Sequence, residues 1–366
     1  MARLRRRVAW FLCATVAVMS ALPVVNVIRR GAMPIPASAL FDTDFAWPAV
    51  SGALRRVGIS TRPQQVIVGK AGWLFLGDQY ARAITDKRRP ADERDIAAAA
   101  RVAAAMRAWA GWLRARGIED WHVLVCADKD TVYPDFLPDW DRPTAGAPID
   151  ALLARADPRG VVDSRPALRA ARASAGPALY LRTDSHWTAR GAWIAYRALA
   201  QGNGARAPGI AWLEDADVRL QPTRLASGDL ARLLQVSDAE GDPAAVAVIA
   251  HARDAQRTQA DALTGRALDA AVLAAVEAPT QPVIVRSPNA LNARRLLWLR
   301  DSFGAALLPY LAATYGEIIE VDRESTPPAR LADLVRRFEP DAVLVSVAER
   351  NARAAWFEAP PPASAE

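Results

Sequence analysis

Residues 295–347 read RLLWLRDSFGAALLPYLAATYGEIIEVDRESTPPARLADLVRRFEPDAVLVSV, and this stretch decides the fold. It contains three short apolar runs separated by two segments long enough for helices: predicted strands at 295–299, 317–321 and 342–347, and predicted helices at about 304–314 and 328–338. Short apolar strands that alternate with helices are typical of a parallel sheet with helices on both faces. The stretch therefore predicts an α/β fold with a mostly parallel sheet.

The same alternation runs upstream and predicts one domain over residues 61–355. Its further elements are a β-hairpin at 65–76, strands at 122–126, 161–162, 178–181 and 282–286, and helices at about 90–116, 148–156, 166–174 and 188–200. Residues 203–280 are rich in Ala and Asp, and we expect an irregular or helical insertion there that carries no chemistry. Residues 356–366 contain three consecutive prolines and predict a disordered tail.

The first thirty residues predict a membrane helix. An uncharged run at 8–28, bracketed by six arginines, spans roughly 30 Å as a helix, which is the thickness of the bilayer hydrocarbon. More arginines precede the run than follow it, which places the N-terminus in the cytoplasm and the rest of the chain outside. We favour a signal anchor at 1–30 with a juxtamembrane stalk at 31–60. The alternatives are a buried helix and a cleaved signal peptide, whose small-residue site at 37–39 would lie well beyond the apolar run.

The net charge of +6 comes entirely from those arginines, because the rest of the chain carries 40 basic and 40 acidic residues. A neutral body lacks the basic surface that follows a phosphate backbone, so no nucleic-acid partner is expected. Cys13 lies in the predicted anchor and Cys126 in a predicted buried strand. The two cysteines are therefore not expected to form a disulfide or a thiolate metal site.

One candidate loop follows the predicted strand 178–181 and holds Asp184 two residues before His186. Ligands of parallel α/β sheets bind outside the carboxyl ends of the strands. A carboxylate bonded to Nδ1 would fix the imidazole tautomer and leave Nε2 as a base. The alternative is structural: Asp184 or Thr188 caps the next helix, and His186 is only a hydrogen-bonded loop residue.

A second candidate loop, LRDSFG at 299–304, places Ser302 between a predicted strand and a helix. A serine there points into the cleft, and the helix start offers backbone N–H groups to an oxyanion. Asp-Ser is also common where a helix begins, so this loop too has a structural alternative. His186 is the best-placed base for Ser302, because we expect His122 in the core or at a sheet edge and His251 on the surface. The sequence has no paired-histidine motif and no Gly-rich phosphate loop, so neither a metal nor a cofactor is expected.

Five segments together resemble the SGNH-hydrolase-like periplasmic O-acetyltransferases of bacterial exopolysaccharides, the alginate O-acetyltransferase AlgJ/AlgX type: residues 68–76, 129–134, 183–192, 300–304 and, more weakly, 340–350. The resemblance implies that Ser302 is the nucleophile, His186 the base and Asp184 its orienting partner. It also suggests four residues in matching segments as candidates for the substrate site: Lys129, Tyr133, Trp187 and Arg300. Arg300 stands where SGNH esterases have the glycine of Gly-Asp-Ser, so their oxyanion-hole residues cannot simply be transferred. The chain ends soon after the last predicted strand, so it is more similar to the AlgJ type, which lacks the carbohydrate-binding module of AlgX.

The resemblance further implies an acetyl-serine intermediate and an exported polysaccharide as the acceptor. It implies a membrane-bound O-acyltransferase partner of the MBOAT type that exports the acetyl group. It places the catalytic domain in the periplasm, held to the inner membrane by the N-terminal helix. Two alternatives stay open: a carbohydrate esterase or deacetylase that uses the same three residues, and a non-catalytic glycan-binding component of an export complex.

Overall fold

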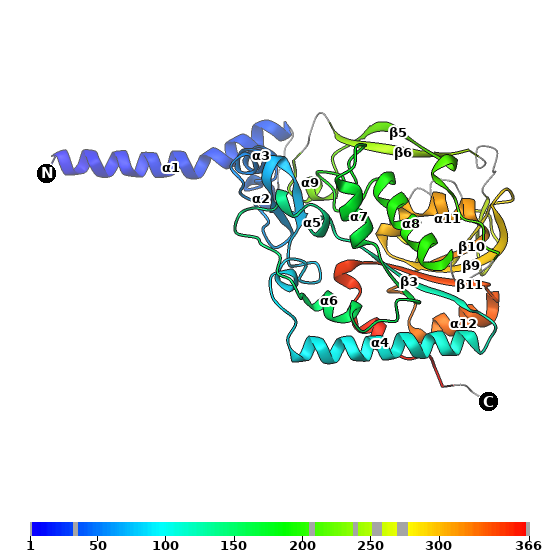
Figure 1. Ribbon diagram of the computed structural model, residues 1–366. Coiled ribbons are helices and arrows are strands. Elements are labelled where there is room, and N and C mark those ends of the chain that lie inside the picture. The colour runs from blue at the N-terminus through cyan, green and yellow to red at the C-terminus, as the bar shows by residue number, and fades with distance from the viewer. Residues whose placement is uncertain are drawn as a thin grey trace.

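The computed structural model describes residues 2–31, 36–204, 209–236, 241–250, 258–268 and 277–363. Within these residues, seven strands form the central sheet of Figure 1, in the order β4 (Val161–Asp163), β3 (Asp120–Cys126), β11 (Ala342–Ala348), β9 (Asn292–Arg300), β10 (Tyr315–Asp322), β8 (Val283–Arg286) and β7 (Thr258–Asp261). The first five strands pair in parallel, whereas β8 and β7 pair antiparallel at one edge. The structure thus has the predicted SGNH-like α/β fold with a mostly parallel sheet.

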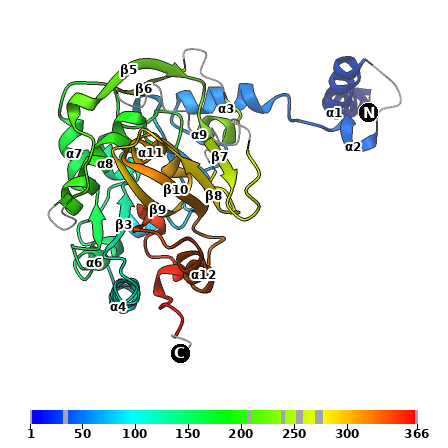
Figure 2. The ribbon, with the colours of Figure 1, turned by 90° about the vertical axis from the view of Figure 1, so that its right-hand side faces the viewer.

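Helices cover both faces of this sheet (Figures 1 and 2). One face carries α4 (Glu93–Arg114), α6 (Pro148–Leu153) and α12 (Pro328–Phe338), and the other carries α7 (Arg165–Arg172), α8 (Ala189–Gly204) and α11 (Leu308–Thr314). Successive strand residues point to opposite faces, so in β3 Leu124 joins one core while Val123 and Val125 join the other. Burial on both faces explains why β3 and β11 are nearly continuous apolar runs.

The stretch 203–280 differs from the expectation, because its described part is built largely of strands. β5 (Val218–Leu225) and β6 (Asp242–Ile249) form a two-stranded antiparallel sheet, and α9 (Asp229–Leu233) lies between them in the chain. β7 extends the central sheet instead of belonging to a separate insertion. Alanine is a weak strand former, so the Ala-rich sequence of β6 conceals a strand that its pairing with β5 stabilises.

A second correction concerns residues 178–181, which were expected to form a strand. Only Tyr180 makes a β-bridge, to Trp187, and the segment joins no sheet. Tyr180 and Leu179 are completely buried, so the segment is apolar because it fills the core. The predicted hairpin is confirmed: β1 (Val66–Val68) pairs antiparallel with β2 (Leu74–Leu76), and both pack against α9.

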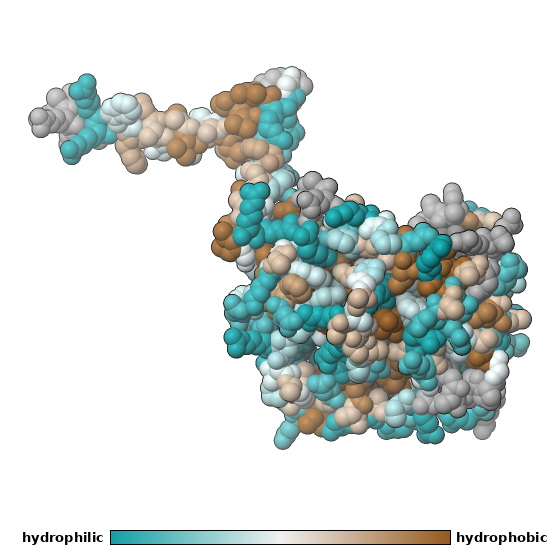
Figure 3. All heavy atoms as spheres, turned by 45° about the horizontal axis from the view of Figure 1, so that its top comes forward, coloured by the Kyte–Doolittle hydropathy of each residue, from teal (hydrophilic) through white to brown (hydrophobic). Residues whose placement is uncertain are grey.

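The N-terminal helix α1 (Ala2–Arg30) projects away from the body, as Figures 1 and 3 show. Residues Ala9–Arg30 are long and apolar enough to cross a membrane, and only 6% of the most apolar window is buried, which makes α1 a candidate anchor rather than a core helix. Two short helices, α2 (Ala37–Leu40) and α3 (Trp47–Arg56), lie between it and the body.

The C-terminal segment was expected to be disordered from residue 356, but it packs on the domain as far as residue 363. Phe357 lies in the core with α4, and Trp356 Nε1 donates a hydrogen bond to the carbonyl of Thr326 at 2.7 Å. Trp109 Nε1 donates to the carbonyl of Ala359 at 3.0 Å. The two aromatic side chains therefore hold the segment that precedes the prolines, and residues 364–366 lie outside the described part.

Candidate active site

Two loops far apart in the chain meet at the carboxyl end of β9. Ser302 begins a 3-10 turn, Ser302–Ala306, directly after this strand. Asp301 fixes the turn, because its carboxylate accepts hydrogen bonds from Phe303 N at 3.0 Å and from Ala348 N at 2.7 Å. His186 lies in the loop between α7 and α8, and Trp187 Nε1 ties this loop to the serine turn through the Phe303 carbonyl at 3.0 Å.

The three residues predicted to act together form a continuous hydrogen-bonded chain. His186 Nε2 lies 2.8 Å from Ser302 Oγ, and His186 Nδ1 lies 2.6 Å from Asp184 Oδ1. The same Asp184 oxygen accepts the backbone N–H of His186 at 2.9 Å, which fixes the angle between the two side chains. With Nδ1 donating to the carboxylate, Nε2 is left to accept the serine proton.

The surroundings of this chain favour a basic imidazole. Burial alone would lower the pKa of His186, but the hydrogen bond and the charge of Asp184, together with the charge of Asp229, raise it above its ordinary value. Burial would raise the pKa of Asp184, yet its bonds and attraction to His186 hold it well below the ordinary range. Asp184 is therefore ionised when His186 takes up a proton.

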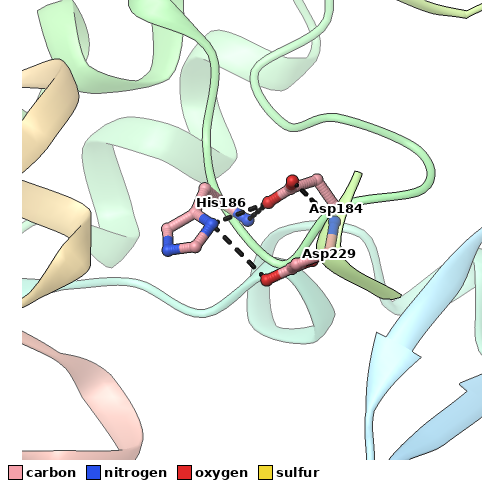
Figure 4. Close-up of side chains that lie close together, drawn as sticks. All are labelled: Asp184, His186 and Asp229. Carbon is pink, nitrogen blue, oxygen red and sulfur yellow. Dashed lines mark hydrogen bonds and ion pairs between the residues drawn. The ribbon is translucent and has the colours of Figure 1, made fainter. Parts of the chain in front are cut away.

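A second carboxylate, Asp229, faces the same imidazole and was missed because it lies in the stretch expected to carry no chemistry. Its Oδ2 lies 3.6 Å from His186 Nδ1, as Figure 4 shows. It also accepts hydrogen bonds from the backbone N–H of Ser185 at 2.7 Å and from the Ser185 hydroxyl at 2.5 Å. In return, Asp229 N donates to Asp184 Oδ2 at 2.9 Å. The only sequence signal was a Gly-Asp pair at a helix start, which is common at helix N-termini.

Asp184, His186 and Asp229 lie close enough together to suggest a metal site, since one ligand atom of each falls within 4.8 Å of the others. Their hydrogen bonds argue for a different arrangement. Both oxygens of Asp184 accept N–H groups, and both oxygens of Asp229 accept bonds from Ser185. A cation would have to displace these bonds, so the donor set fits a Ser-His-Asp chain better than a metal centre.

The four candidates for the substrate site are all less than 10% exposed and mainly support the loops. Lys129 Nζ donates to three carbonyls of the histidine loop, including that of Asp184 at 2.6 Å; burial lowers its pKa to about 8, although nearby carboxylates oppose this. The Tyr133 hydroxyl accepts the N–H of Leu179 at 3.1 Å. Arg300 Nε donates to Glu320 Oε2 at 3.0 Å, one strand away. Trp187 alone of the four lines a cavity beside Ser302.

Arg350 is a cationic residue of the site to which the sequence assigned no role. It lines a groove of about 470 Å³ together with His186 and Ser302. Its guanidinium is paired with Asp128, and its backbone N–H donates to the same carboxylate at 3.1 Å. Asp128 is held in turn by the buried Lys87 at 3.0 Å. The guanidinium is thus fixed before any ligand arrives.

The remaining histidines are remote from this chemistry or lie outside the described part. His122 is 5% exposed in β3, and its Nε2 lies 2.9 Å from Asp120 Oδ1, in keeping with a core position. His251 falls outside the described residues.

A parallel α/β sheet with a serine after one strand, bonded to a histidine and an aspartate of one loop, defines an SGNH-hydrolase-like protein. Residues 66–275 match the family model described as "SGNH hydrolase-like domain, acetyltransferase AlgX", and the chain belongs to this family. The family resemblance drawn from the sequence is therefore confirmed. The match includes Asp184 and His186 and ends before Ser302, whose assignment depends on the geometry.

Solved structures share the fold at low sequence identity. Bacillus cereus PatB1 aligns with a TM-score of 0.61 and 16% identity, over 80% of this chain and 98% of PatB1. A DHHW family protein from Eubacterium siraeum aligns with a TM-score of 0.57 and 15% identity, over 84% and 98% of the two chains. The O-acetyltransferase domain of Pseudomonas putida AlgJ aligns with a TM-score of 0.46 and 17% identity, over 79% and 92%. No curated protein sequence matches the chain.

Proposed function

We propose that this protein is an O-acetyltransferase that moves an acetyl group through an acetyl-Ser302 intermediate onto a hydroxyl of an exported polysaccharide. The observation that carries the proposal is the 2.8 Å contact between His186 Nε2 and Ser302 Oγ, with Asp184 on the other ring nitrogen. Membership of an acetyltransferase family supports the type of reaction. A polysaccharide acceptor, an MBOAT-type acetyl exporter and attachment to the inner membrane through α1 complete the proposal.

The first transfer loads the serine. His186 takes the Ser302 proton as Oγ attacks the acetyl carbonyl carbon of the donor ester, which forms a C–O bond and an oxyanion. The Ser302 N–H at the start of its turn and the Arg350 guanidinium, which lines the same groove, are the proposed donors to that oxyanion. Collapse of the oxyanion breaks the bond to the leaving alkoxide, which takes its proton from His186.

The second transfer repeats these steps with a sugar hydroxyl. His186 deprotonates the hydroxyl, which attacks the acetyl-serine and releases Ser302 with its proton restored. The groove beside His186 suits a sugar, because it is lined by polar side chains that include Arg62, Asp229 and Glu277. Water would complete the same cycle in an esterase.

The test uses the full chain with an activated acetyl ester. We expect mass spectrometry to find one added acetyl group on the peptide that contains Ser302. We then expect this group to pass to an added oligosaccharide. Free acetate alone, with no acetylated sugar, would favour the esterase, and an unlabelled Ser302 would overturn the proposal.

Asp229→Asn is expected to change the pH dependence of acetyl-Ser302 formation. The reaction needs neutral His186, so its rate falls as the pH drops through the pKa of this residue. Asp229 is one of the charges that raise that pKa, and its removal should move the midpoint of the profile to lower pH by about one unit. The measurement is kcat/KM of the activated ester between pH 5 and 9, on the order of one point per half unit.

The control is Asp333→Asn, which removes an exposed carboxylate on α12 and should leave the midpoint unchanged. A midpoint that moves to higher pH in Asp229→Asn would contradict the role given to its charge.

Gly228→Ala is expected to disturb the aspartate rather than the nucleophile. A Cβ at this position would lie 2.2 Å from Asp184 Cβ, so the loop before α9 or Asp184 must shift. We expect unfolding free energy to fall by about 1–3 kcal/mol and ester turnover to fall about 100-fold, since misplacement by roughly 1 Å costs this much. Thermal unfolding and kcat/KM measure the two effects.

Gly111→Ala is the matched control, because it lies in α4 with nothing within 4 Å of the added Cβ. It should keep full turnover. Full turnover in Gly228→Ala as well would show that the close approach to Asp184 is irrelevant to the reaction.

A further inference from the structure

Two cavities of different chemistry meet at the Ser302 hydroxyl. The groove of about 470 Å³ extends from His186 toward Arg62, Tyr80 and Glu277. A separate pocket of about 280 Å³ extends the other way, over the turn that follows Ser302. The two share only His186, Arg232 and Ser302. A group bonded to Ser302 therefore has two directions open to it.

Apolar side chains make up most of the smaller pocket, which we call the acyl pocket: Leu181, Trp187, Leu225, Phe303, Ala305 and Ala306. Trp187 and Phe303 pack edge to face with ring centroids 5.1 Å apart, and the indole N–H is used by the Phe303 carbonyl. Leu225 is 47% exposed, an unusual state for a leucine beside a candidate nucleophile. These surfaces offer contacts to hydrocarbon and few to a sugar.

The wall that carries Leu225 is fixed in place by hydrogen bonds to the histidine loop. Gly228 N donates to Thr183 Oγ1 at 3.0 Å, and Thr183 N donates to Asp242 Oδ2 at 2.7 Å. The Ala231 N–H donates to the Thr183 carbonyl at 3.1 Å. The acyl pocket is thus built before substrate binds, by the same contacts that hold Asp184.

The chemistry of two successive transfers requires this separation. The acyl group stays on Ser302 while the leaving alcohol departs and the acceptor alcohol enters, and both alcohols must reach His186. We infer that the acyl pocket holds the acyl chain and the polar groove holds the two alcohols in turn, which rests on the proposed function. An acetyl group has only three non-hydrogen atoms and fills little of a cavity whose size approaches that of drug-binding pockets. The site therefore accepts short unbranched acyl chains beyond acetyl, such as butanoyl and hexanoyl.

The test compares acetyl, butanoyl and hexanoyl esters of p-nitrophenol with the full chain. Each wholly buried methylene is worth about a fourfold gain, so a partly open pocket should give at least about twofold for each one. We expect kcat/KM for acyl-Ser302 formation to be at least about fourfold higher with butanoate than with acetate. A steady fall from acetate to hexanoate overturns the acyl pocket.

Variants of the pocket wall make the test specific. Ala306→Leu and Ala305→Leu each fill the acyl pocket and should lower the ratio of butanoate to acetate turnover about tenfold. Leu225→Ala should lower it about threefold by removing contact area, whereas Val246→Ala removes an exposed apolar side chain from the neighbouring strand β6 and should not change it.

The turnover ratio separates pocket effects from folding, because a partly unfolded variant loses both activities equally. A ratio unchanged in both Ala306→Leu and Ala305→Leu, with normal thermal unfolding, rejects the proposal. Failure of every ester to label Ser302 rejects the proposed function itself, so the two failures are distinguishable.

Discussion

Ser302→Ala should abolish acetyl transfer, with kcat/KM for the activated ester falling by about 10⁴-fold or more. The substitution removes the only atom that Nε2 of His186 contacts at 2.8 Å on the side away from Asp184. Without the hydroxyl no acyl-enzyme forms, and only binding and oxyanion contacts can assist attack by water. The measurements are ester turnover and the acetyl mass on the peptide that contains residue 302.

The control is Ser174→Ala, which removes an exposed hydroxyl beyond α7 and should keep full turnover. In cells, the same Ser302 variant should leave the exported polymer without acetyl groups. Unchanged acetylation of the polymer by Ser302→Ala would favour the non-catalytic glycan-binding alternative.

The parts of the fold that could be predicted are those where local pattern and burial agree. β3 and β11 are buried along their whole length, so their apolar runs carry the signal without ambiguity. The Ser302 loop was also predictable, because a polar turn directly follows one of these strands. What brings His186 to it across 116 positions is the packing of Trp187 against Phe303, which no local pattern reveals.

The parts that were missed depend on tertiary contacts. Residues 178–181 are as apolar as a strand, but they are buried by packing without a ladder of hydrogen bonds. Asp229 stands in a sequence with no recognisable pattern, and its importance comes only from its bonds to Ser185 and to the loop of Asp184. Similarly, Lys129 matches a family segment yet acts behind the loop. Sequence similarity identified the segments, whereas the structure shows which side chains face the cavities.

Asp184→Asn is expected to lower kcat for acetyl transfer by about 10³- to 10⁴-fold near neutral pH. The carboxylate accepts the Nδ1–H of His186 on one oxygen and the Asp229 N–H on the other. An amide has only one accepting atom, so one of these donors must face an NH₂ group or the imidazole must change tautomer. A changed tautomer puts the proton on Nε2, which then cannot take the proton of Ser302. The lost negative charge also lowers the pKa of His186, because it no longer stabilises the imidazolium.

This substitution distinguishes catalysis from helix capping, the structural alternative for Asp184. A cap needs only an oxygen that accepts a backbone N–H, and asparagine supplies one almost as well as aspartate. A cap therefore predicts turnover within about tenfold of the unaltered protein, with little change in thermal unfolding. The catalytic chain predicts nearly the same unfolding temperature but a rate lower by at least about 10³-fold, measured as acetyl-Ser302 formation at saturating ester. Because Ser302 and its turn are untouched in Asp184→Asn, the loss must come from the imidazole, and turnover close to that of the unaltered protein would remove Asp184 from the mechanism.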